Sequence, residues 1–141
     1  MRAGEESGGY AFREHLPERD GCYAGLLILD LLARSGKTMS ELVQELYAKT
    51  GEHFYDRIDV QLQAGQRDAV LQRVVDAAPD AIAGRKLLKR DATDGYRFEF
   101  DGGWLLVRPS GTEPLLRIYT ETTDAALVQP VLQAGREIAG V

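Results

Sequence analysis

The sequence has little of what several classes of protein require. It contains one cysteine, Cys22, and two histidines, too few for an internal disulfide or for a zinc site built from these residue types. Its 17 Lys and Arg are outnumbered by 22 Asp and Glu, and the net charge of −5 argues against a dedicated nucleic-acid binder, which needs a basic surface. The longest strongly apolar stretch, 26–32, is interrupted by Asp30 and is too short to span a bilayer. The first residues do not form a signal peptide, so we expect a soluble, cytoplasmic protein with no membrane or nucleic-acid partner.

What is present suffices for one ordinary domain, or for a small domain and a piece of another. The chain has 141 residues, of which 44% are hydrophobic and 28% are charged, a balance typical of globular proteins. Its first fifty residues differ in character from the rest. We therefore predict a boundary near residue 50, with a helical remnant of one domain in 1–50 and a complete domain in 51–141.

The first region predicts two helices. Ten of the thirteen residues in 22–34 are apolar, and Asp20 stands where it can cap a helix. This helix is apolar nearly all round, so it belongs inside a larger protein, with Cys22 as an inert core thiol. A second helix is predicted over 38–49, and its first four residues, Thr-Met-Ser-Glu, form a capping box.

The second region predicts a compact α+β domain. One strand and one helix are followed by three or four antiparallel strands and a final helix, an order that suits an antiparallel sheet of about four strands packed on helices. Phe98, Phe100 and Trp104 are predicted to lie in its core, and Pro130 either kinks the last helix or lies in its first turn. The expected strands are 57–62, 86–90, 96–100, 104–108 and 115–122, and the expected helices are 66–78 and a segment that starts near 124.

The segment between Arg108 and Arg117 carries the strongest chemical signal. It places Ser110, Gly111 and Thr112 in a short loop between two predicted strands. Two hydroxyls, successive backbone N–H groups and a glycine that permits close approach, with an arginine on each flanking strand, are the groups that hold a phosphate dianion. An ordinary turn with two solvated arginines is the alternative, and both interpretations stay open at this point.

A second candidate segment, the glycine-rich stretch 4–9, lies near the N-terminus. Gly, Glu and Ser near a chain end most often form a flexible terminus. The functional alternative is that Glu5 and Ser7 bind sugar hydroxyls, because a carboxylate accepts hydrogen bonds from two neighbouring hydroxyls and a serine donates or accepts one. Composition alone favours the flexible terminus.

Together the two segments resemble the α-D-phosphohexomutases, the family of phosphoglucomutase and phosphomannomutase, with phosphoglucosamine mutase as a close relative. The sugar-binding loop of that family, Gly-Glu-x-Ser-Gly near the end of its third domain, is similar to 4–8. The phosphate-binding loop of its fourth domain, Arg-x-Ser-Gly-Thr-Glu-Pro followed by an arginine, is similar to 108–114 and Arg117. The resemblance covers essentially the whole chain and implies a TATA-binding-protein-like fold for the fourth domain.

The resemblance also implies a function and roles for individual residues. The family moves a phosphoryl group between the 1- and 6-positions of a hexose through a bisphosphate, with a phosphoserine and a magnesium ion held by aspartates. Glu5 and Ser7 would contact sugar hydroxyls of this hexose phosphate. The residues that would hold or support its non-reacting phosphate are Arg108, Ser110, Gly111, Thr112 and Arg117.

Two departures from the family pattern shape the expectation. The serine nucleophile and the magnesium loop belong to the family's first two domains and do not stand in this sequence. We therefore expect a C-terminal fragment with no catalytic residue and no metal of its own, which needs the missing N-terminal domains and is inactive alone. Position 9 is a glycine where some members have histidine, which weakens the phosphoglucosamine mutase interpretation. The second hypothesis is a stand-alone, non-catalytic anion-binding or interaction module of the same fold.

Overall fold

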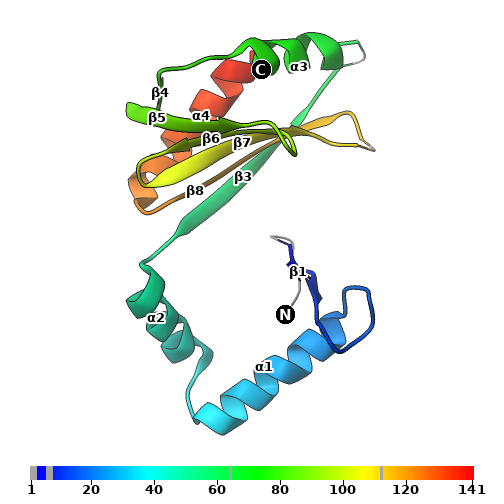
Figure 1. The fold of residues 1–141 in the computed structure, drawn as a ribbon, viewed down its shortest axis with the longest axis vertical. Coiled ribbons are helices and arrows are strands. Elements are labelled where there is room, and N and C mark those ends of the chain that lie inside the picture. Colours follow the sequence, from blue (N-terminus) through cyan, green and yellow to red (C-terminus); the bar gives the residue numbers. More distant parts are fainter. Residues whose placement is uncertain (1–2, 6–7, 64, 112) are drawn as a thin grey trace. The chain divides into compact units, whose positions relative to one another are not determined.

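The computed structural model describes residues 3–5, 8–63, 65–111 and 113–141. The chain divides into two compact units, Met1–Thr50 and Gly51–Val141, here the N-terminal unit and the C-terminal unit (Figure 1). No helix in the described part of the chain is long and apolar enough to cross a membrane.

The N-terminal unit consists of a short hairpin followed by two helices. As predicted, Asp20 caps the first helix, because its Oδ1 accepts a hydrogen bond from the backbone N–H of Tyr23 at 2.9 Å. The helix ends at Gly36, whose backbone N–H donates to the carbonyl of Leu32. The elements in order are β1 (Ala3–Gly4), β2 (Tyr10–Ala11), α1 (Gly21–Ser35) and α2 (Met39–Thr50).

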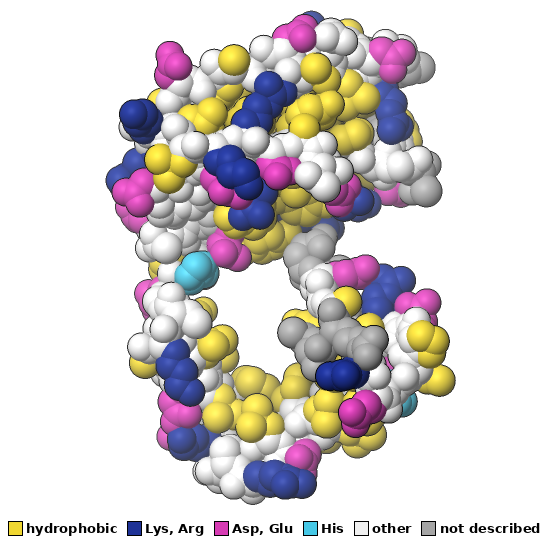
Figure 2. Space-filling model, viewed as in Figure 1, with side chains coloured by type: hydrophobic (Ala, Val, Ile, Leu, Met, Phe, Trp, Pro, Cys, Tyr) yellow, Lys and Arg dark blue, Asp and Glu magenta, His cyan; other side chains and the backbone are white. Residues whose placement is uncertain are grey.

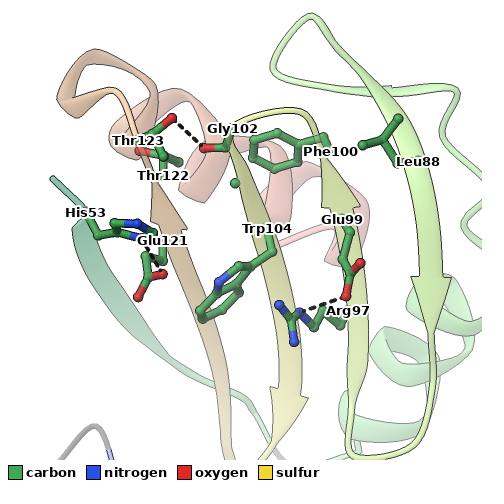
Figure 3. Close-up of a pocket in the computed structure, with 11 residues that line it drawn as sticks. His53, Leu88, Arg97, Glu99, Phe100, Gly102, Trp104, Glu121, Thr122 and Thr123 are labelled. Carbon is green, nitrogen blue, oxygen red and sulfur yellow. Dashed lines mark hydrogen bonds and ion pairs between the residues drawn. The ribbon is translucent and has the colours of Figure 1, made fainter. Parts of the chain in front are cut away.

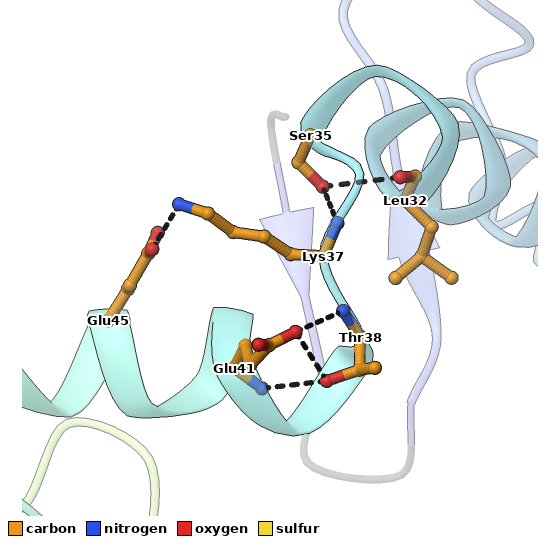
Figure 4. Close-up of polar contacts among 6 residues, drawn as sticks. All are labelled: Leu32, Ser35, Lys37, Thr38, Glu41 and Glu45. Atoms are coloured by element: carbon orange, nitrogen blue, oxygen red, sulfur yellow. Dashed lines mark hydrogen bonds and ion pairs between the residues drawn. The ribbon is translucent and has the colours of Figure 1, made fainter.

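The capping box at the start of α2 is also confirmed (Figure 4). The Glu41 carboxylate accepts from the backbone N–H of Thr38 at 2.7 Å, and the Thr38 hydroxyl accepts from the backbone N–H of Glu41 at 3.3 Å. These bonds lower the pKa of Glu41, with the Thr38 backbone as the largest cause. Lys37 forms an ion pair with Glu45, one helical turn after Glu41. Side chains of α2 therefore hold both Lys37 and Thr38, the two residues that precede the helix.

The apolar surface of α1 is mostly exposed within its own unit. Ala24 is the buried residue of this helix, whereas Leu26 and Leu29 are 63% and 61% exposed. Figure 2 shows hydrophobic side chains at the surface of this unit. Cys22 is exposed as well, so its predicted place in a core is wrong for the described chain. The reason is that the described residues of this unit form no second surface that covers the helix.

The C-terminal unit is built on a six-stranded antiparallel sheet, which confirms the α+β class. The predicted number of about four strands is too low. β4 has two residues, too few to show a period, and β3 joins the same sheet beside β8. The sheet order is β3-β8-β7-β6-β5-β4, from β3 (Phe54–Gln61), β4 (Ala81–Ile82), β5 (Arg85–Asp91), β6 (Tyr96–Phe100), β7 (Gly103–Pro109) and β8 (Leu115–Thr122).

Two helices, α3 (Arg67–Asp76) and α4 (Val128–Ala139), cover one face of this sheet (Figure 1). α4 packs on β7, β8 and β3, and α3 packs against α4. Pro130 lies in the first turn of α4, after a short 3₁₀ turn η1 (Ala125–Leu127), as one of the two alternatives predicted. The buried cluster between helices and sheet includes Val70, Val74, Phe98, Phe100, Leu105, Val107, Leu116, Ile118, Val131 and Leu132.

Alternation along the strands sends the remaining side chains to the other face of the sheet. Trp104 belongs to that face and is half-buried there, so its predicted place in the core is wrong, whereas Phe98 and Phe100 are core residues as predicted. No described helix of this unit covers the second face, here the open face (Figure 1). It carries most of the charged side chains of the strands.

Candidate functional site

The predicted phosphate loop connects β7 to β8 at one end of the sheet. The backbone N–H of Ser110 donates to the carbonyl of Leu115 at 2.8 Å, which continues the ladder of the two strands into the loop. The carbonyl of Pro114 accepts from the backbone N–H of Leu62 at 2.8 Å. The loop is therefore anchored on both sides, by β7 and by the residue that follows β3.

The two predicted arginines face each other across this pair of strands. Arg108 on β7 lies directly opposite Arg117 on β8 in the antiparallel register. Both side chains belong to the open face, because Val107, Leu116 and Ile118 take the buried face. Directly opposite residues have Cα atoms about 5 Å apart, and two like charges in such a pair destabilise it. An anion between the guanidinium groups would remove that repulsion.

Each arginine has a carboxylate partner in the described structure. Arg108 Nε lies 3.1 Å from Asp94 Oδ1, and Arg117 Nη2 lies 3.4 Å from Glu113 Oε2. The Tyr119 side chain, then the Asp59 and Glu113 carboxylates, raise the pKa of Arg117. Three carboxylates, those of Asp59, Asp94 and Glu113, therefore offset the positive charge of the two arginines.

The Nε of Arg117 is the one buried side-chain nitrogen or oxygen, among the described residues, that has no hydrogen-bond partner. Burying such a donor without a partner is costly, and because the atom is enclosed, a ligand oxygen reaches it only if the Arg117 side chain turns. A phosphate oxygen is a suitable acceptor, because guanidinium groups bind phosphate through paired N–H donors.

The structure places the three loop residues differently. Ser110 is buried, and its hydroxyl accepts from the backbone N–H of Glu113 at 3.3 Å. Gly111 is exposed, lacks a positive φ and would have nothing within 4 Å of an added Cβ, so no strained backbone requires it; its missing side chain leaves open space beside the loop. Thr112 lies outside the described residues, and its predicted role stays a prediction.

Sequence reasoning missed the contact of Asp94 with this site. The residue was visible as part of an Asp-Gly turn between β5 and β6, but its place beside Arg108 depends on the sheet order. Gly95 fixes the turn there: its φ is +83°, and an added Cβ would lie 3.0 Å from both Arg108 Cβ and the carbonyl oxygen of Val107. The antiparallel pairing of β6 with β7 brings this turn beside Arg108.

The predicted sugar loop, whose residues 6 and 7 lie outside the described structure, connects β1 to β2. The backbone N–H of Glu5 donates to the carbonyl of Gly9 at 2.9 Å, so the described part of 4–9 is an ordered turn. Glu5 Oε2 accepts a hydrogen bond from Arg19 Nη1 at 2.7 Å. This bond is the largest of the interactions that raise the pKa of Arg19. A side chain at position 9 would meet Arg19 Cδ at 2.8 Å. Ser7 lies outside the described residues.

Arg19 is the second contact that sequence reasoning missed. It is separated from Glu5 by fourteen positions, and no local period connects them. Glu5 belongs to the N-terminal unit and the loop at Arg108 belongs to the C-terminal unit. Their predicted roles toward one substrate stay predictions.

A cavity of about 300 Å³ lies on the open face, at the other end of β7 and β8 from the loop (Figure 3). Its charged groups pair with one another: His53 Nδ1 lies 2.9 Å from Glu121 Oε1, and Arg97 Nε lies 3.5 Å from Glu99 Oε1. The guanidinium of Arg97 also lies 5.1 Å from the centre of the Trp104 ring. Nothing in this cavity indicates a particular ligand.

The described residues contain no group of three or more His, Cys, Asp or Glu side chains that could hold a metal ion. The acids around Arg108 and Arg117 each face a cation. They therefore do not fit a magnesium ion.

Comparison with known proteins agrees over both units. The protein-family model for the C-terminal domain of phosphoglucomutase/phosphomannomutase matches residues 60–137. The family model for its alpha/beta/alpha domain III matches residues 1–50. A phosphoglucomutase/phosphomannomutase of Thermococcus kodakarensis is 36% identical over 132 residues, 94% of this chain and 27% of the relative. A phosphoglucosamine mutase of Methanococcus maripaludis is 28% identical over 134 residues, 94% of this chain and 28% of the relative. The chain thus spans about a quarter of the length of these relatives.

Solved structures show the same correspondence. A protein of Thermus thermophilus that was assigned as a phosphomannomutase is 34% identical with a TM-score of 0.74, over 98% of this chain and 26% of that one. A phosphoglucomutase/phosphomannomutase family protein of Burkholderia thailandensis, 24% identical over 97% of this chain and 28% of that one, shares the fold with a TM-score of 0.69. The two family models adjoin along the chain and the structures cover nearly all of it, so this chain belongs to the phosphoglucomutase/phosphomannomutase family, of which it carries the end of domain III and the C-terminal domain.

Proposed function

We propose that this chain is the substrate-phosphate-binding end of a phosphohexomutase that interconverts hexose 1-phosphate and hexose 6-phosphate. The observation that carries the proposal is the pair of arginines directly opposite each other beside the Ser110–Pro114 loop. Two like charges in register repel each other, the carboxylates that pair with them are largely exposed, and the buried Nε of Arg117 lacks an acceptor. The non-reacting phosphate of the substrate supplies both the negative charge between the two arginines and a hydrogen-bond acceptor.

The work of this site is positional. A phosphate held by Arg108, Arg117, Ser110, Gly111 and Thr112 fixes the far end of the hexose, so that the sugar oxygen to be phosphorylated is held for in-line transfer. Glu5 accepts hydrogen bonds from sugar hydroxyls, assisted by Ser7, and Arg19 holds the Glu5 carboxylate in place. We expect the magnesium chemistry in the missing N-terminal domains, because the resemblance places the magnesium loop of the family there.

The partners in this proposal are a hexose phosphate and the N-terminal domains of the same cytoplasmic enzyme. The phosphoserine and the magnesium loop expected from the family lie in those domains, so the chain alone binds without turning over substrate. The relatives comprise both a phosphoglucomutase/phosphomannomutase and phosphoglucosamine mutases. Glucose, mannose and glucosamine phosphates are therefore all candidate substrates.

Titration of the whole 141-residue chain tests the phosphate site. Addition of glucose 6-phosphate or mannose 6-phosphate should shift the backbone amide NMR signals of Ser110 and Gly111, whereas glucose without phosphate should not. Arg117→Gln should weaken binding about tenfold or more, the size expected for loss of a charged hydrogen bond. Arg97→Gln, which removes the same charge from the same face at a distance from the loop, is the matched control.

Two results would overturn the proposal. Amide signals of the loop that stay fixed at millimolar sugar phosphate argue against a preformed site. Conversion of glucose 1-phosphate to glucose 6-phosphate by the purified chain argues against a role confined to binding. Binding of inorganic sulfate and sugar phosphates with equal affinity would instead favour a general anion-binding module.

A further inference from the structure

The two arginines lie in a row of four charged groups drawn from four parts of the fold. Asp59 on β3 lies opposite Arg117 on β8, and Arg117 lies opposite Arg108 on β7. Asp94, from the turn between β5 and β6, completes the row at 3.1 Å from Arg108 Nε. The order across the sheet is therefore acid, arginine, arginine, acid.

The turn that carries Asp94 is held against β7 by its backbone. Gly95 has a φ of +83°, and the space beside it is so narrow that a Cβ would lie 3.0 Å from Arg108 Cβ. The Asp94 carboxylate is thus kept beside Arg108 by the hairpin itself, although the Asp94 side chain is 73% exposed. This proximity is built into the pairing of β6 with β7.

The Nε of Arg108 lies 3.1 Å from Oδ1 of Asp94, an ion pair with the turn on the side of β7 away from β8. An anion bound between the two arginines needs donors of Arg108 on the opposite side. A guanidinium group has five N–H donors and can serve both groups, but the Asp94 carboxylate repels the anion and offsets part of the positive charge that the anion would meet. An exposed ion pair of this kind is weak, so phosphate can displace it, but at a cost in affinity.

We propose that Asp94 is a positioning residue for Arg108 that opposes phosphate binding through its charge, which makes the β5–β6 turn part of the phosphate site. The inference rests on the proposed function of the Ser110–Pro114 loop. It assigns the turn a role in setting affinity: Asp94 neutralises Arg108 when the site is empty and releases it when the dianion arrives. Affinity for phosphate is kept lower than the two arginines alone would give.

The test compares two charge removals on the same hairpin in the whole chain. Asp94→Asn should tighten binding of inorganic phosphate about threefold at about 0.15 M salt, as expected for release of an exposed ion pair. Asp91→Asn removes the same charge from β5, where Asp91 pairs with Lys89 at 3.7 Å, and should change the affinity by a smaller factor. An equal gain in both variants, or an unchanged or weaker affinity in Asp94→Asn, overturns the inference.

A spectroscopic readout separates positioning from a purely structural role. In the absence of added phosphate, Asp94→Asn should shift the Nε–H NMR signal of Arg108 in the direction in which phosphate shifts it in the unaltered chain, and Asp91→Asn should leave the signal in place. An Arg108 signal that ignores Asp94→Asn overturns the inference. If Arg117→Gln weakens phosphate binding while Asp94→Asn changes nothing, the inference fails and the proposed function stands. If the unaltered chain binds no phosphate at all, both fail.

Discussion

The C-terminal unit buries its hydrophobic side chains in one cluster, whereas the N-terminal unit leaves most of its described ones at the surface. Phe98, Leu105 and Ile118 are fully enclosed between sheet and helices. In α1, a helix rich in leucine, Leu26 and Leu29 are largely exposed and Ala24 is the buried residue. The difference does not come from how apolar the segments are.

What differs is the number of layers that each unit contains. A sheet or helix buries its apolar face against a second layer, and the C-terminal unit has both a sheet and two helices to do so. The described N-terminal unit has two helices and a short two-stranded ladder. The family model that matches residues 1–50 describes domain III as an alpha/beta/alpha domain, and the described N-terminal unit contains fewer layers than that description names.

The largest expected effect is a loss of stability in the C-terminal unit, the better-packed of the two. Phe98→Ala should destabilise the C-terminal unit by about 3–5 kcal/mol, because it removes a fully buried aromatic side chain and leaves a cavity. Chemical denaturation monitored by amide NMR signals of residues 54–139 measures it. Leu88→Ala, at a position 66% exposed, should stay within about 0.5 kcal/mol. Equal losses in the two variants would contradict the packing described.

The next effect concerns the exposed helix. Because α1 presents leucine side chains to solvent, the chain should self-associate, and Leu29→Glu should weaken that association about tenfold or more. Sedimentation over a range of concentrations measures it. Leu88→Glu, equally exposed on the other unit, should leave the association unchanged. A strictly monomeric chain at several hundred micromolar would show that the exposed surface of α1 is not adhesive.

The smallest expected effect is the loss of helix capping at low pH in the N-terminal unit. The backbone N–H of Tyr23, followed by His15, lowers the pKa of Asp20, and the Thr38 backbone lowers that of Glu41. A lowered folded pKa stabilises the helix ends above the unfolded values of 3.8 and 4.5, and this stability is lost as the pH falls through the folded values. Carbon chemical shifts of residues 39–42 should therefore lose helical character below about pH 4.5.

A matched variant checks the cause of this acid effect. Glu41→Gln keeps the size of the side chain but removes its titration. Its first turn of α2 should be less helical at neutral pH and should change little on acidification. If the variant and the unaltered chain respond alike to acid, the capping box does not control this helix end.

Local features were predictable because their partners stand within four residues of each other. Asp20 and Tyr23, or Thr38 and Glu41, lie within one helical turn, so the sequence is sufficient to pair them. The loop between Arg108 and Arg117 was likewise recognisable as a turn between two strands. The two-residue strand β4 was missed because a period cannot be read from two positions.

Features that depend on a distant partner were not predictable. Phe98 and Trp104 are both aromatic strand residues, but antiparallel pairing puts Phe98 opposite Leu105 under the helices and Trp104 opposite Glu99 on the open face. Arg19 meets Glu5 across fourteen positions, and Asp94 meets Arg108 only because β6 lies beside β7. Contact between such residues is a property of sheet order and register.

By itself the sequence determined the helix caps, the alternating strands, the two candidate binding loops and the family to which they belong, because these depend on residues close together in the chain. Only the tertiary structure decided that Arg108 and Arg117 stand face to face, that acids from β3 and from the β5–β6 turn flank them, and that the leucines of α1 remain uncovered. The physical reason is that burial and charge pairing are set by the surface a residue meets, which comes from elements far away in the chain.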